Sequence, residues 1–134
     1  MIYRYASIVL PALILMGCSQ PAGQQLQAGP FTVWISNEPE PLEVGERALF
    51  TMVVENSQGG AVEDCQARFR QTMPGMEMST DEVYVVLAPQ GKGRYQGMSH
   101  EFHMGGDWVL AFELSCGSGD PQVLSLERHL EWPE

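Results

Sequence analysis

From Phe31 to about Trp132, apolar residues alternate with polar ones at a period of two rather than 3.6. Prolines, glycines and asparagines interrupt this alternation at intervals of roughly eight to fifteen residues, and no window favours a long helix. Short strands joined by turns are typical of two packed antiparallel sheets. We therefore predict an all-β fold, an immunoglobulin-like β-sandwich of about seven antiparallel strands.

Seven segments carry the strand pattern, and short runs of turn residues separate them. Between the fifth and the sixth, the glycines of 105–107 predict a tight hairpin, because glycine adopts positive φ values at little cost. The sixth begins at Trp108, presents apolar residues at every second position and is expected to be half-buried. The segments are 31–36, 48–55, 65–70, 83–87, 95–104, 108–116 and 122–130.

The first 17 residues have the layout of a secretory signal. Arg4 gives this end a positive charge, and the apolar run 6–16 that follows is interrupted by Pro11. The run is too short to cross a hydrocarbon layer of ~30 Å but suits a cleaved signal peptide. Residues 15–18 (LMGC) resemble the lipobox of bacterial lipoproteins, which implies cleavage before Cys18 and acylation of that cysteine. The alternative is an ordinary secretory signal with a chance cysteine, and both place the mature protein outside the cytoplasm.

The segment 18–30 follows as a polar sequence with proline, glycine and only one large aliphatic residue, Leu26. Such a sequence cannot bury enough apolar surface to order itself, so we predict a flexible tether that spans roughly 20 Å. The remaining residues, 31–134, have the size of one domain with one core. The expected organisation is a signal peptide (1–17), a lipidated cysteine with its tether, and a β-sandwich. The lipid would anchor this domain to a membrane of the bacterial cell envelope, facing the periplasm or extracytoplasmic space.

The mature chain is strongly acidic. Of the seven lysines and arginines only Arg4 is lost with the signal, so six basic residues face 17 acidic ones, a formal charge of −11. This charge repels phosphate backbones and disfavours nucleic-acid binding. The acidic balance is also typical of a merely soluble surface, and it names no partner.

Two cysteines remain once Cys18 is assigned to lipid. Cys65 and Cys116 fall at inward positions of predicted strands, and an even pair in an oxidising compartment indicates a disulfide. Closing about fifty residues would stabilise the fold by roughly 4 kcal/mol in the chain-entropy model. We expect their Cα atoms to lie about 5.5 Å apart, with Trp108 packed in the same core as in immunoglobulin domains. Two buried free thiols or a thiolate metal site are the alternatives, although neither cysteine has CxxC spacing.

Two clusters of methionine and histidine suit a soft metal ion. One lies in a predicted loop, where three of the mature chain's six methionines gather, although methionine usually fills cores and loops are exposed. The other lies in 98–104, next to the predicted hairpin. Thioether sulfur and imidazole nitrogen are favoured donors for Cu(I). The candidate copper ligands are Met73, Met76, Met78, Met104, His100 and His103.

Each cluster also has an interpretation without a metal. The loop at Met73 would suit an apolar cap on the sandwich, and Met52 and Met98 lie among apolar strand residues, which favours a core position. By period two, Met98, His100 and Met104 would share one strand face, so His100 can also be interpreted as a buried, hydrogen-bonded histidine. No strict ligand spacing such as HxxxH is present.

Three motifs occur in a fixed order: MPGMEM at 73–78, GRYQG at 93–97 and MGGDW at 104–108. Together they resemble the YtkA-like domain, an immunoglobulin-like β-sandwich module of bacterial envelope proteins that is related to the FixH family. The resemblance spans roughly residues 31–116. It implies a non-enzymatic domain, often found near copper handling or respiratory-oxidase maturation. It extends a copper role to Met73, Met76, Met78 and Met104, whereas the two histidines are added from local chemistry alone.

No catalytic arrangement competes with a binding role. The sequence has no nucleophile elbow, no phosphate-binding glycine loop and no helical histidine pair, so we predict that the protein is not an enzyme. The first hypothesis is a lipid-anchored module that binds Cu(I) or delivers it to a copper-receiving partner. The alternative is a structural or adaptor lipoprotein that presents an edge strand or loop to a partner protein of the envelope.

Overall fold

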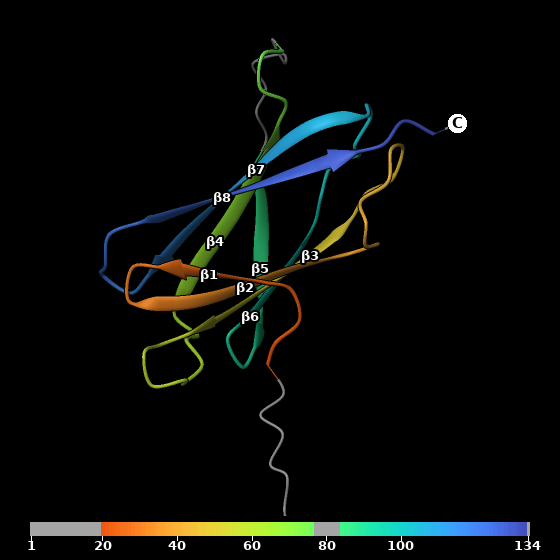
Figure 1. The fold of residues 1–134 in the computed structure, drawn as a ribbon. Coiled ribbons are helices and arrows are strands. Elements are labelled where there is room, and N and C mark those ends of the chain that lie inside the picture. The colour runs from red at the N-terminus through yellow and green to blue at the C-terminus, as the bar shows by residue number, and fades with distance from the viewer. Residues whose placement is uncertain (1–19, 77–83, 134) are drawn as a thin grey trace, which may run out of the picture.

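The computed structural model describes residues 20–76 and 84–133, so Cys18 and Met78 lie outside the described residues. Within these ranges the predicted all-β fold is confirmed, with eight antiparallel strands in the order β1-β2-β3-β6-β5-β4-β7-β8 (Figure 1). No helix in this part of the chain is long and apolar enough to cross a membrane. The strands are β1 (Gln24–Ala28), β2 (Phe31–Glu38), β3 (Leu49–Glu55), β4 (Cys65–Thr72), β5 (Val85–Gly91), β6 (Arg94–Met98), β7 (Gly106–Cys116) and β8 (Gln122–Leu130).

The sheet folds over at β5, so that its two halves face each other across one core. Residues 85–87 of β5 pair with β4, whereas residues 88–91 pair with β6. One half therefore contains β1, β2, β3 and β6, and the other contains β4, β7 and β8. The two edge strands approach each other: the side chain of Arg128 in β8 donates a hydrogen bond to the side chain of Gln24 in β1 at 3.0 Å. The sheet is therefore nearly closed.

Aromatic side chains from both halves meet at the centre of the core. The ring centroids of Phe50 (β3), Phe69 (β4) and Phe112 (β7) lie 4.9–5.8 Å from one another. All three side chains are buried, and burial of each contributes roughly 1.5–3 kcal/mol to folding. The alternation predicted for β4 and β7 is confirmed, since every second residue of both strands faces this core.

The structure corrects the predicted tether, because residues 24–28 form β1. This strand pairs with β2 from Gln24↔Ile35 to Ala28↔Phe31, and Gly29, with a φ of +58°, begins the two-residue turn between them. Main-chain hydrogen bonds to β2 and the buried Ala28 side chain order a segment that is too polar to fold alone. The folded domain therefore begins before residue 31, and β1 is the strand that the prediction lacked.

The structure also corrects the segment that leads to β7. The predicted strand 95–104 ends at Met98, and the predicted hairpin at 105–107 is absent, because β6 and β7 lie in different halves of the sheet. The intervening residues 99–105 form a crossover beside the loop that joins β2 to β3. Individual hydrogen bonds between main-chain groups hold it there, for example from the amide of Phe102 to the carbonyl of Glu46 at 3.1 Å.

This correction changes the surroundings of three predicted residues. Met98 was expected in the core but is 52% exposed, whereas Met52 is fully buried as expected. Because the strand ends at Met98, His100 and Met104 do not share its strand face. His100 is exposed, so its interpretation as a core histidine is wrong.

The predicted disulfide between Cys65 and Cys116 is confirmed. Its Cα atoms are 4.0 Å apart rather than about 5.5 Å, because the two cysteines are direct cross-strand neighbours on β4 and β7. Trp108 belongs to the same core, but it lies eight residues along β7, roughly 26 Å away. The expected shared core is therefore confirmed, although Trp108 does not pack on the disulfide as the tryptophan of immunoglobulin domains does. The hydroxyl of Tyr95 lies near the bridge instead and accepts a hydrogen bond from the Cys65 amide at 3.2 Å.

Candidate functional site

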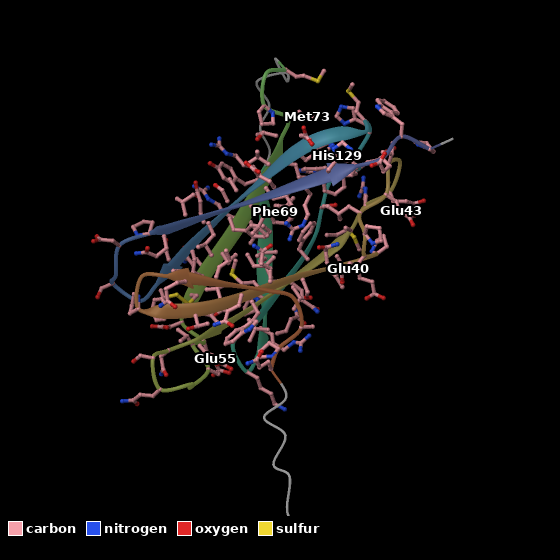
Figure 2. All side chains as sticks on the ribbon, in the orientation of Figure 1. Glu40, Glu43, Glu55, Phe69, Met73 and His129 are labelled. Carbon is pink, nitrogen blue, oxygen red and sulfur yellow. A yellow bond between two sulfur atoms is a disulfide. The ribbon has the colours of Figure 1, made fainter. Side chains whose placement is uncertain are left out.

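Two segments meet at one end of the molecule, and we call them together the methionine rim: residues 73–76, which follow β4, and residues 99–105, which precede β7. The side chain of Gln71, in β4 just before the first segment, holds the second segment at His100. Its Oε1 accepts a hydrogen bond from the His100 amide at 2.8 Å, and its Nε2 donates to the His100 carbonyl at 3.1 Å. Figure 2 shows Met73 at this end, among sulfur-bearing side chains.

The methionines of the rim differ in exposure. Met73 is only 7% exposed and belongs to the core. Its methyl group packs against β7, because a Cβ added at Gly106 would lie 3.1 Å from the Met73 Cε. Met76 is 49% exposed, and Met104 is partly buried against the core. The thioether of Met76 is therefore accessible from solvent, whereas Met73 fixes the loop to the domain.

Trp108 positions the neighbouring histidine and methionine. Its Nε1 donates a hydrogen bond to the Met104 carbonyl at 3.0 Å, and the ring of Phe102 packs edge-on against it at 5.2 Å. The exposed His103 ring makes a similar edge contact at 5.5 Å. The imidazole of His103 and the thioether of Met104 are thus carried on a segment anchored by a buried indole.

The structure thus brings five of the predicted ligands to one end of the molecule. Among the residues it describes, no three side chains of histidine, cysteine, aspartate or glutamate are grouped in a way that would hold a metal ion. Met78 lies outside the described residues, so its predicted role stays a prediction. The five residues of the rim are Met73, Met76, His100, His103 and Met104.

A third histidine, which the sequence analysis did not single out, lies next to the rim. His129 of β8 contacts the Asp107 carboxylate through Nδ1 at 2.7 Å and Glu131 through Nε2 at 3.4 Å. The hydrogen bond to Asp107, together with the charges of both carboxylates, raises the pKa of His129 above 6.5, although partial desolvation opposes the shift. The pair Asp107↔His129 arises from the register of β7 and β8, which no local sequence pattern reveals.

The chain matches the model of one protein family. The model described as YtkA-like matches residues 25–113, about two thirds of the sequence. The chain belongs to the YtkA-like family. The match begins within β1, in agreement with the corrected domain boundary, and it ends in β7.

Several solved structures are similar to this YtkA-like chain at low sequence identity, and the likeness to the first of them concerns the fold alone. The soluble domain of PmoD from Methylocystis sp. (Rockwell) is 13% identical, with a TM-score of 0.53, and the match covers 81% of this chain and 98% of that one. A DUF4785 family protein from Legionella pneumophila (13% identity, 75% and 29% covered, TM-score 0.47) and the Lin-41 filamin domain (14% identity, 72% and 91% covered, TM-score 0.42) are more distant. A comparison with curated proteins gave no match.

Proposed function

We propose that this YtkA-like protein is a lipid-anchored module of the cell envelope that binds or delivers Cu(I) at the methionine rim. The observation that carries the proposal is the exposed thioether of Met76 on a loop that Gln71 and Met73 fix beside the segment bearing His103 and Met104. Thioether and imidazole groups are the donors that Cu(I) prefers, and Cu(I) would be cargo rather than a structural ion.

The side chains of the methionine rim differ in how easily they could reach a Cu(I) ion. Met76 and His103 are exposed and Met104 is partly accessible, so these side chains can reach a metal from solvent. Met73 already has a packing role in the core, and we assign it to holding the loop rather than to the metal. Met78 and His100 remain ligand candidates from the sequence.

The proposed location rests on the signal sequence and on the disulfide. Residues 15–18 match a lipobox, and a disulfide such as that between Cys65 and Cys116 persists in oxidising compartments outside the cytoplasm. We also interpret the fold as a variant of the immunoglobulin-like β-sandwich, in which β5 belongs to both layers. We keep the prediction that the protein is not an enzyme.

Anaerobic titration with Cu(I) against a competing chelator tests the proposal. We expect the wild-type protein to bind Cu(I), and the triple variant Met76→Leu, Met78→Leu, Met104→Leu to bind it about tenfold more weakly or worse. Met52→Leu is the matched control, since Met52 is fully buried in the core. Met73→Leu should also retain affinity, because leucine preserves its packing volume.

Two results would reject the copper site: no binding by the wild type, or equal binding by the wild type and the triple variant. The adaptor hypothesis would then stand first. In the described part of the chain, β1 and β8 are the edge strands of the sheet, and an edge strand can pair with a strand of a partner protein.

A further inference from the structure

An exposed tryptophan lies beside the methionine rim and belongs to neither of the predicted clusters. Trp132 follows β8 and is 59% exposed, whereas Trp34 and Trp108 are buried. The exposed part of this ring is available to a ligand, and an indole combines a large apolar surface with an electron-rich face. The unusual feature of Trp132 is its position next to the rim residue Gly105.

The indole of Trp132 lies against the backbone of Gly105. A Cβ at position 105 would lie 2.8–2.9 Å from Cδ1, Cγ and Cδ2 of Trp132, so the backbone of Gly105 faces the five-membered ring. Gly105 does not have a positive φ, unlike its neighbour Gly106. The structural reason for glycine at position 105 is therefore room for the indole, on the residue directly after Met104.

The chain just before Trp132 is also held in place. His129 lies between the carboxylates of Asp107 and Glu131, at 2.7 and 3.4 Å. The contact with Asp107 joins the end of β8 to the start of β7, and the contact with Glu131 holds the residue that precedes Trp132. The indole is thus fixed at two points beside the rim, and more than half of its surface stays open to solvent.

We infer that Trp132 is part of the Cu(I) site and offers the face of its indole to the ion bound at the rim. The inference rests on the proposed function. Among aromatic side chains, tryptophan attracts cations most strongly through the electron-rich face of its ring. An indole beside thioether and imidazole ligands would limit the access of water and oxidants to a bound Cu(I) ion without adding a charged ligand.

Tryptophan emission during Cu(I) titration tests this inference. The full-length lipidated protein in detergent is titrated anaerobically, and binding is followed in parallel with a competing chelator. We expect emission to fall as Cu(I) binds and to stop falling at saturation. The fall should be much smaller in Trp132→Phe, in which Trp108, whose ring contacts that of His103, still reports part of the binding, and it should be retained in Trp34→Phe, the control for a buried tryptophan. Trp132→Leu should weaken binding about two- to thirtyfold.

Gly105→Ala is a second variant, which keeps the indole but displaces it, because the added methyl group would overlap the ring. This variant should show a smaller change in emission. The inference is overturned if Cu(I) binds without a change in emission, if the change is undiminished in Trp132→Phe, or if Trp132→Leu binds as tightly as the wild type. Each of these results leaves copper binding by the rim intact. Absence of Cu(I) binding by the wild type, in contrast, rejects the proposed function and the inference with it.

Discussion

Tyr95 shows how a single hydroxyl group supports the fold where β5 leaves β4. Its ring is buried, and its hydroxyl accepts a hydrogen bond from the Cys65 amide at 3.2 Å and donates one to the Val62 carbonyl at 2.9 Å. Residues 67–69 of β4 pair with β5, whereas Cys65 lies before this paired stretch. The hydroxyl therefore replaces a strand as the partner of the Cys65 amide, and burial raises the pKa of Tyr95.

We predict that Tyr95→Phe lowers the free energy of unfolding by about 1–3 kcal/mol, because it leaves buried main-chain groups without their partner. Urea unfolding measures the change. Tyr84→Phe is the matched control: the Tyr84 hydroxyl contacts the Glu113 carboxylate at 3.2 Å in a more exposed position, so its loss should cost less than about 1 kcal/mol. Equal losses in the two variants would contradict this account of Tyr95.

His129 should make stability depend on pH. Because the Asp107 carboxylate raises the pKa of His129, its favourable contact is fully present below the unfolded value of about 6.5 and is lost as pH rises through the raised folded value. We expect an NMR titration to give a His129 pKa above 6.5, and Asp107→Asn to lower it while Glu131 retains part of the shift. An unchanged pKa in Asp107→Asn would refute the pairing.

At the scale of elements, β1 is the strand whose own sequence least suggests order. It buries Ala28 and partly buries Leu26, and its register with β2 is continuous over five residue pairs. Without β1, the backbone of β2 would become an exposed edge. The stability of β1 therefore comes from its neighbour rather than from its composition.

We predict that a chain beginning at residue 31 unfolds at lower urea concentration than one beginning at residue 20, with a loss of roughly 1–3 kcal/mol. A chain beginning at Gly23 retains β1 and serves as the control, with an unchanged midpoint. Equal midpoints for all three chains would mean that β1 contributes nothing to stability and that the tether extends to residue 30.

For the whole molecule, the two ends of the domain have different roles in the proposal. The chain enters at Gln24 in β1, on an edge strand, while the methionine rim lies where β4 ends and β7 begins. Figure 1 shows the described N-terminal segment leaving the domain opposite the loop that follows β4. If Cys18 carries a lipid as proposed, the rim lies at the end of the domain away from the membrane.

Lipidation itself is testable in a bacterium that expresses the full chain. We expect a palmitate analogue to label the wild type, which should sediment with membranes, because several acyl chains anchor a protein stably. Cys18→Ala should lose the label and the anchor. The double variant Cys65→Ala, Cys116→Ala should keep the label, since its Cys18 is intact. Labelling of Cys18→Ala would show that the lipobox interpretation is wrong.

The amino-acid sequence alone was sufficient for the features that depend on local periodicity. A period of two determines which residues of β4 and β7 face the core, because successive side chains of a strand point to opposite faces. The pairing of Cys65 with Cys116 followed from cysteine number and compartment. The clustering of methionines in two segments of the chain followed from simple inspection.

Only the tertiary structure decided which distant residues meet. The pairs Asp107–His129 and Gly105–Trp132 are more than twenty residues apart in the chain, and strand register brings them together. The split of β5 between two halves of the sheet turned a predicted hairpin into a crossover and moved Met98 to the surface. Strand pairing depends on hydrogen bonds between main-chain groups that every residue carries. The sequence therefore determined the faces of the strands, whereas their partners, and with them the composition of the rim, were decided by the packing of the whole domain.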